Sequence, residues 1–267
     1  MRQLYFKRRE AMFEMIFMLL LGVMIGSFLN VCIYRIPAGE SIIFPRSHCM
    51  SCGHTLGALE LIPVLSYLGL RGQCKQCHHH ISPRYMCIEL ITGMSFGYIY
   101  SLYSMRLETL MSCTFLVFAI VLTMIDWDQM LLPTKIIYCG IAIGIMEYVV
   151  QGILLQQWTG LWQAIIGAVV GYGLFALLYY GSKWLLKKEG LGYGDVRLMG
   201  LIGWFVGVQQ IGLVILVAAL LASVYGIVLL KVRKSSAPYP FGPFLNMGAC
   251  IAMLWGTPIM TWYLGLF

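Results

Sequence analysis

Residues 187–195 read KKEGLGYGD and residues 125–128 read IDWD, and each stretch lies at the end of a long apolar run. The two stretches hold the only aspartates of the chain, Asp126, Asp128 and Asp195. A carboxylate at membrane depth is energetically costly and is therefore a candidate for function. Two such carboxylates brought together share one proton and can activate a water molecule. The two stretches therefore predict a membrane-embedded aspartyl protease.

The composition of the whole chain excludes an ordinary soluble fold. Of its 267 residues, 60% are hydrophobic and only 11% are charged, with a mean hydropathy of +0.82. A soluble domain carries about 25% charged residues. Apolar runs of about 20 residues recur, as in membrane helices, and nothing shows the alternation of a barrel. We therefore expect an all-α polytopic membrane protein whose main surroundings are the lipid bilayer.

The net charge of +7 does not indicate a nucleic-acid partner, because the basic residues are scattered over loops. Most Lys and Arg residues lie in four polar segments, residues 34–84, 126–135, 183–197 and 231–240. The positive-inside rule places such segments in the cytoplasm. Segments on one side of a membrane are separated by an even number of crossings, so two helices are expected in each interval.

The crossings can be counted from the breaks between apolar runs. Turns are expected near residues 104–106, 156–160 and 209–210. One further helix precedes Tyr34 and one follows Pro243, which gives about eight transmembrane helices with both termini outside. In this arrangement Asp126 ends an inward-running helix and Asp195 begins an outward-running one. Both carboxylates then lie at the cytoplasmic side of the membrane.

The chain is expected to divide into four parts. Residues 1–11 are basic, which disagrees with an outside terminus, so we interpret Met12 as the native start. A mass spectrum of the native protein showing Met1 would contradict that hypothesis. The expected parts are a tail at 1–11, an N-terminal region at 12–104 containing a polar loop at 34–84, a peptidase domain at 105–234, and a last loop and helix at 235–267.

The polar loop carries two Cys-x-x-Cys pairs, Cys49/Cys52 and Cys74/Cys77, with 21 residues between them. Four thiolates at this spacing are typical of a structural zinc site of zinc-ribbon type. Two disulfides are the alternative, but they require an oxidising compartment, whereas the topology places the loop in the cytoplasm. The five histidines also lie in this loop and could replace a thiolate, although we expect them to be exposed: His48, His54, His78, His79 and His80.

The aspartates differ in depth. Asp126 and Asp128 point about 200° apart on a helix, so at most one of them faces a partner. Asp126 is the deeper of the two and is the expected partner of Asp195, while Asp128 is interpreted as a helix-end or surface residue. Gly192 and Gly194 are expected to allow close backbone approach and unusual dihedrals beside Asp195. A dinucleotide-binding interpretation of these glycines fails, because no strand precedes them.

Two other classes of protein are alternatives to a protease for this sequence. A transporter using the acidic pair for ions or protons explains buried aspartates equally well. It leaves the cysteine loop and the glycines beside Asp195 unexplained, and no inverted repeat is visible. A scaffold without chemistry leaves the placement of the aspartates unexplained.

The chain resembles the bacterial type IV prepilin peptidases of the GxGD aspartyl protease class from Met12 onward. The matching stretches are residues 26–31 (GSFLNV), 34–37 (YRIP), the paired Cys-x-x-Cys, 62–67 (IPVLSY), 70–72 (LRG), 84–85 (RY), 89–90 (EL), 125–126 (ID), 132–133 (LP), 192–195 (GYGD) and 240–244 (PFGPF). Thr134 stands where the family commonly has an aspartate after Leu-Pro. Met50 replaces a common proline in the first cysteine pair.

The resemblance implies a bifunctional enzyme of the bacterial inner membrane. Asp126 and Asp195 would cleave the leader of a prepilin or pseudopilin after a glycine, on the cytoplasmic side. The N-terminal region would then methylate the new N-terminal residue with S-adenosylmethionine, whose binding residues the sequence does not reveal. Glu89 is the one acidic group at membrane depth there. It either pairs with Arg84 or Arg71, which we favour, or faces the cofactor or the substrate amine.

Overall fold

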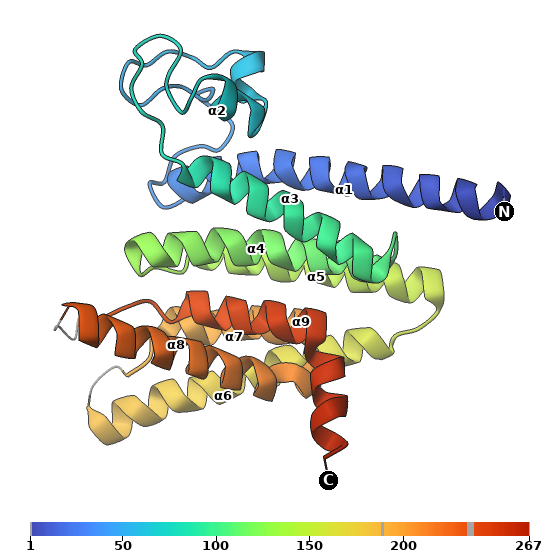
Figure 1. The fold of residues 1–267 in the computed structure, drawn as a ribbon. Helices are drawn as coiled ribbons and strands as arrows, with labels where there is room; N and C mark the ends of the chain where they lie inside the picture. Colours follow the sequence, from blue (N-terminus) through green and yellow to red (C-terminus); the bar gives the residue numbers. More distant parts are fainter. Residues whose placement is uncertain (1, 188–189, 234–237, 267) are drawn as a thin grey trace. The chain divides into compact units, whose positions relative to one another are not determined.

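The computed structural model describes residues 2–187, 190–233 and 238–266 (Figure 1). Within these residues the chain is helical and forms no strand. The long helices are α1 (Arg2–Arg35), α3 (Arg84–Tyr103), α4 (Leu107–Gln129), α5 (Thr134–Leu155), α6 (Thr159–Leu186), α7 (Tyr193–Val206), α8 (Ile211–Arg233) and α9 (Gly242–Leu264). The short ones are η1 (Ala58–Leu61), α2 (Leu65–Gly69) and η2 (Val208–Gln210).

The expected all-helical fold is confirmed, and the helices break at the three turns expected near residues 104–106, 156–160 and 209–210. Among the described residues, six helices are long and apolar enough to cross a membrane. They include neither α3 nor α7, so the count of eight crossings stays a prediction. Lys188 and Lys234, which contribute to the predicted positive-inside pattern, lie outside the described residues, as do Glu189 and Met1. Residues 2–11 of the expected tail are the first part of α1.

The chain forms two compact units, an N-terminal unit (Met1–Cys113) and a C-terminal unit (Thr114–Phe267). In the N-terminal unit α1 and α3 pack closely through glycines. A β-carbon added at Gly22 would lie 2.8 Å from the Cα of Gly93, and one added at Gly26 would lie 2.8 Å from the Cα of Glu89. Small residues of this kind let membrane helices approach at backbone distance.

The C-terminal unit is built around α7. This helix packs against α5, α6 and α9, and Val196, Leu198 and Met199 are completely buried. Its contact with α6 is made through glycine, because a β-carbon at Gly167 would lie 2.2 Å from the carbonyl oxygen of Gly203. At 14 residues, α7 is about 21 Å long, which is less than the roughly 30 Å of a bilayer core.

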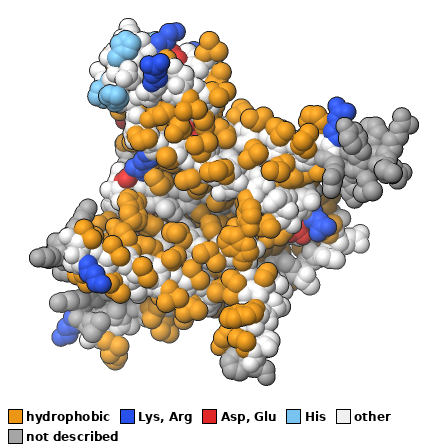
Figure 2. Space-filling view, viewed as in Figure 1, with side chains coloured by type: hydrophobic (Ala, Val, Ile, Leu, Met, Phe, Trp, Pro, Cys, Tyr) orange, Lys and Arg blue, Asp and Glu red, His pale blue; other side chains and the backbone are white. Residues whose placement is uncertain are grey.

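Apolar side chains cover the helices on the face shown in Figure 2, while charged side chains are few. Large apolar side chains on α6 and α8 are half or more exposed, such as Trp162, Leu177, Leu216 and Val224. A soluble monomer rarely exposes contiguous apolar surface of this kind. Together with the six long apolar helices, this surface indicates a multi-pass membrane protein.

Candidate active site and metal centre

The two aspartates of the predicted pair are both buried in the C-terminal unit. Asp126 lies near the end of α4 and is 5% exposed, and Asp195 lies in the first turn of α7 and is 7% exposed. Their carboxylates are close enough for the charge of Asp126 to act on Asp195. Asp128, two residues along the same helix, is exposed. The structure therefore gives the two residues of IDWD the opposite orientations expected from helical periodicity.

A leucine between α4 and α5 lies close to the glycines next to both carboxylates. Leu132 is 8% exposed. A β-carbon added at Gly194, beside Asp195, would lie 3.0 Å from the Cβ of Leu132. One added at Gly242 would lie 3.4 Å from the Cδ1 of Leu132 and only 2.5 Å from the Oδ2 of Asp126. The end of α4, the start of α7 and the start of α9 therefore meet at this point.

The glycines beside Asp195 have ordinary backbone dihedrals, and what they provide is room for neighbouring atoms. Gly192 has φ −70° and ψ 135°, which any residue adopts, and Gly194 has no positive φ, so the expectation of unusual dihedrals was wrong. A β-carbon at Gly192 would lie 3.2 Å from the Oδ2 of Asp195. The absence of side chains at these two positions leaves the carboxylate and Leu132 close to bare backbone.

Each of the two carboxylates lies beside the N-terminus of a helix. The carboxylate of Asp126 is buried and lies against the backbone N–H of Gly242, although no hydrogen bond of standard geometry from the described residues reaches its Oδ2. It lies at the first residue of α9, and Asp195 lies in the first turn of α7, so two helix N-termini face the pair. Helix N-termini favour negative charge. The backbone around the two aspartates therefore favours a negative charge at this site.

Two groups of residues near the aspartates were not predicted from the sequence. Arg197 donates a hydrogen bond to the Oγ1 of Thr134, and its guanidinium lies 4.5 Å from the ring centroid of Tyr193. The hydroxyls of Tyr193 and Tyr172 are 3.0 Å apart. This network ties the starts of α5 and α7 to α6. The position of Thr134 after Leu-Pro was noted in the sequence, but nothing there indicated Arg197 as its partner.

The second group is an aromatic cluster beside Asp126. Its ring centroids lie 5.3–6.5 Å apart in tilted or edge-on pairs. The members come from α4, α8, the segment before α9, and α9 itself: Trp127, Tyr225, Tyr239 and Phe244. The hydroxyl of Tyr239 donates to the carbonyl of Ala222, 3.0 Å away. The aromatic letters around IDWD and PFGPF were the only signal for this cluster.

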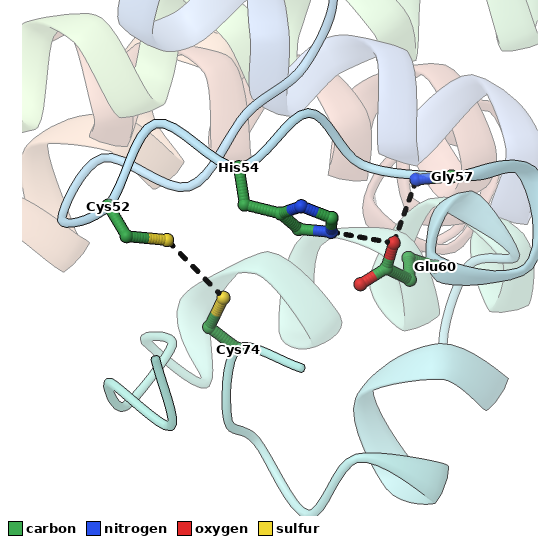
Figure 3. Close-up of polar contacts among 5 residues, drawn as sticks. All are labelled: Cys52, His54, Gly57, Glu60 and Cys74. Carbon is green, nitrogen blue, oxygen red and sulfur yellow. Dashed lines mark hydrogen bonds and ion pairs between the residues drawn. The ribbon is translucent and has the colours of Figure 1, made fainter. Parts of the chain in front are cut away.

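The four cysteines of the loop come together in the N-terminal unit. All four sulfurs lie within 4.8 Å of one another. The sulfurs of Cys49 and Cys77 are 3.8 Å apart and those of Cys52 and Cys74 are 3.9 Å apart, the latter pair being drawn in Figure 3. A zinc ion with four Zn–S bonds of about 2.3 Å requires S···S edges of about 3.8 Å. The cluster therefore fits tetrahedral zinc, and a disulfide of about 2.05 Å fits neither pair.

The backbone of His54 contacts the first cysteine pair, since its carbonyl accepts the N–H of Cys49 at 2.8 Å. The Nε2 of His54 lies 3.2 Å from the Oε2 of Glu60, which also accepts the N–H of Gly57 at 2.8 Å (Figure 3). These contacts, the Gly57 N–H first, hold the pKa of Glu60 below its usual value. His78, His79 and His80 are exposed as expected, whereas His48 and His54 are half-buried.

Glu89 is buried in the N-terminal unit, where its Oε2 accepts a hydrogen bond of 2.7 Å from the backbone N–H of Val64. This contact with the segment that carries IPVLSY was not expected from the sequence, where an ion pair with an arginine was favoured. The two stretches that hold Glu89 and Val64 are thereby brought together.

Comparison with known proteins places both units in one family. Residues 20–103 match the bacterial peptidase A24 N-terminal domain, and residues 113–227 match the type IV leader peptidase family. A relative from Aeromonas salmonicida is 35% identical over 94% of both chains. One from Pseudomonas putida is 36% identical over 90% of both chains. Both relatives are named prepilin leader peptidase/N-methyltransferase.

A third relative with the same name, from Aeromonas hydrophila, is 36% identical over 96% of this chain and 94% of its own. No solved structure matches the chain significantly. None of these comparisons supports a transporter. The identity and coverage of the relatives show that the chain belongs to the type IV leader peptidase family, a family of proteases.

Proposed function

We propose that this protein is a membrane-embedded aspartyl endopeptidase that removes the leader of type IV prepilins or pseudopilins after a glycine. We further propose that it methylates the new N-terminal residue, using S-adenosylmethionine. The observation that carries the proposal is the buried pair of Asp126 and Asp195, drawn from α4 and α7 into one site. The names of the relatives support both activities.

In the proposed mechanism the two carboxylates share one proton. The ionised member removes a proton from a water molecule, while the protonated member donates a hydrogen bond to the scissile carbonyl and polarises it. Coupled carboxylates titrate as a pair, so either aspartate can take either role. The bare backbone at Gly192 and Gly194 gives an extended substrate segment room to lie beside Asp195.

The site is proposed to face the cytoplasm. Asp126 precedes the segment that contains Lys135, and Asp195 follows the segment that contains Lys183 and Lys187. Basic segments of this kind favour the cytoplasmic side of a membrane. The hydrophobic helix of the substrate would stay in the bilayer, so that cleavage takes place at the membrane surface.

The cysteine cluster is proposed to hold a structural zinc ion through Cys49, Cys52, Cys74 and Cys77. Four thiolates fill a tetrahedral shell, so such an ion supplies folding energy to the loop rather than chemistry. Glu60, held by the N–H of Gly57, fixes the ring of His54 in the loop that carries the first pair of cysteines.

The proposed function is tested by incubating a prepilin with the purified protein and S-adenosylmethionine and measuring the intact mass of the product. The expected product begins at the residue after a glycine and carries one additional methyl group. An uncleaved prepilin would contradict the peptidase. A cleaved but unmethylated product would contradict only the second activity.

A further inference from the structure

A polar pair lies on the close contact between α1 and α3 in the N-terminal unit. Gly26 and Asn30 are one turn apart on α1, and they face Tyr85 and Glu89, which are one turn apart on α3. The backbones meet at Gly26 and Glu89, and the Nδ2 of Asn30 donates to the carbonyls of Tyr85 at 3.1 Å and Gly26 at 3.3 Å. Asn30 is 4% exposed and Glu89 is 7% exposed. Asn30 and Glu89 therefore lie within one helical turn of each other along the α1–α3 contact.

The hydrogen bonds of Asn30 leave an acceptor unused. Its two amide contacts fix which end of the side chain is the donor, and the Oδ1 is buried with no partner among the described residues. A buried polar atom left unpaired costs about 1–3 kcal/mol. A stable fold retains such an atom more readily when it binds a donor from outside the unit.

Glu89 adds a negative charge to this acceptor. The Oε2 of Glu89 accepts the N–H of Val64, and a carboxylate has about four acceptor positions in all. The donor of that bond, Val64, is the centre of a γ-turn with φ 61° and ψ −53°, closed by the N–H of Leu65 on the carbonyl of Pro63 at 2.6 Å. This turn is rare and strained for a β-branched residue, and such strain is found mainly at functional sites.

Two aromatic rings lie at the same end of the α1–α3 contact. The rings of Tyr34 and Tyr85 stack with centroids 5.3 Å apart and an interplanar angle of 9°. The guanidinium of Arg84 lies 6.0 Å from the Tyr34 ring. This end of the α1–α3 contact therefore combines a carboxylate and an unpaired acceptor with two stacked rings, one of which already holds the guanidinium of Arg84.

We propose that Asn30 and Glu89 form the amine-binding end of the methyl-transfer site. An N-terminal ammonium group carries the N–H donors that the Oδ1 of Asn30 and the carboxylate of Glu89 accept, together with the charge that Glu89 neutralises. S-adenosylmethionine also carries an α-ammonium group, so binding of the methyl donor at this pair is an outcome of the test: it would raise the KM for S-adenosylmethionine in Glu89→Gln, whereas the proposal predicts a KM within about twofold of wild type. This inference rests on the proposed methyltransferase function.

In the proposed step, S-adenosylmethionine supplies the methyl group and accepts the electron pair of the broken bond. The ammonium group gives one proton to the carboxylate of Glu89 and becomes a neutral amine. The lone pair of the amine nitrogen then attacks the methyl carbon of S-adenosylmethionine. The N–C bond forms, the C–S bond breaks, and its electron pair goes to sulfur, which becomes a neutral thioether. Glu89 acts as a general base, a role that contributes about 10²–10⁴-fold in rate.

The alternative role for Glu89 is only to hold the turn at Val64. Two variants distinguish the roles. Glu89→Gln keeps an oxygen that can accept the Val64 N–H but has no charge and takes no proton. Glu89→Asp keeps the charge but is one methylene shorter, so the contact with Val64 is weakened. Glu14→Gln is the matched control, because Glu14 lies on the same helix pair, where its Oε2 accepts the hydroxyl of Tyr100 at 2.7 Å.

The experiment measures prepilin cleavage and methylation of the cleaved pilin separately by intact mass, at pH 7 and pH 9. Glu89→Gln is expected to cleave within about twofold of wild type and to methylate at least about 100-fold more slowly at pH 7. The methylation defect should shrink at pH 9, because an α-amino group with a pKa of about 7.7–8.0 is then already neutral. The other titratable side chains at this contact, Tyr34, Arg84 and Tyr85, are unchanged in every variant.

Glu89→Asp should retain more methylation than Glu89→Gln, and Glu14→Gln should behave as wild type. Wild-type-like methylation by Glu89→Gln, or a loss that is the same at both pH values, would overturn the inference. If Glu89→Gln also fails to cleave, the Asp variant decides, since a purely positional role predicts that it loses methylation. A wild-type protein that cleaves but never methylates would instead contradict the proposed methyltransferase.

Discussion

At the scale of single residues, the candidate active site depends on glycines that make room for carboxylates. Gly242 is the clearest case, because it begins α9 directly against Asp126. A methyl group there would overlap the carboxylate oxygen and force either the side chain or the helix end to move. Such contacts join residues far apart in the sequence. No pattern of letters could have indicated that PFGPF lies against IDWD.

Gly242→Ala is therefore expected to displace the carboxylate of Asp126 and to reduce prepilin cleavage by at least about tenfold, because small errors in the position of a catalytic group are costly in rate. Gly212→Ala is the control, since Gly212 is the second residue of α8 and a β-carbon there meets nothing within 4 Å. Cleavage is measured in membranes at equal protein levels. Equal activity of the two variants would contradict the role given to Gly242.

At the scale of helices, α7 combines the shortest length of the eight long helices with the most complete burial among the described residues. The apolar runs and helical periodicity were enough to predict the breaks near residues 104–106, 156–160 and 209–210, but not the start of α1 at Arg2. They also gave the opposite orientations of Asp126 and Asp128 on α4. The partners of α7 could not be predicted, because contacts such as Gly167 with Gly203 depend on the tertiary arrangement.

Gly167→Ala tests the packing of α7 on α6. The added β-carbon would lie 2.2 Å from the carbonyl oxygen of Gly203, so the helices must separate, with a loss of stability of about 1–3 kcal/mol. Gly173→Ala on the same helix meets nothing within 4 Å and should be neutral or slightly stabilising. Thermal unfolding in detergent compares the two variants. An unchanged Tm for Gly167→Ala would show that the close contact is absent in solution.

At the scale of the whole molecule, the chain consists of two units, each with its own candidate site. The Cys-x-x-Cys spacing alone was enough to predict the cysteine cluster, because a short motif with fixed ligand geometry leaves few arrangements. The surroundings of Glu89 and the Arg197 network could not be predicted, since both join distant segments by single hydrogen bonds.

Removal of one thiol tests the metal centre. Cys52→Ser is expected to reduce bound zinc from about one per chain to below about one-tenth, because a site of four thiolates loses a ligand. The loop at residues 34–84 should then become sensitive to protease, since the metal holds a segment of this size folded. Cys139→Ser, on α5, is the control for the loss of a free thiol. Full zinc content in Cys52→Ser would contradict the predicted ligand set.

The central claim concerns Asp126 and Asp195, and its most direct test is prepilin cleavage by Asp126→Asn, Asp128→Asn and Asp195→Asn at matched expression in membranes. The amide cannot serve as a base, so the first and third variants should lose at least about 100-fold in rate, while Asp128→Asn stays within about twofold of wild type. Cleavage by Asp126→Asn together with loss in Asp128→Asn would make Asp128 the partner of Asp195. Cleavage by Asp195→Asn at the wild-type rate would contradict the aspartyl protease mechanism.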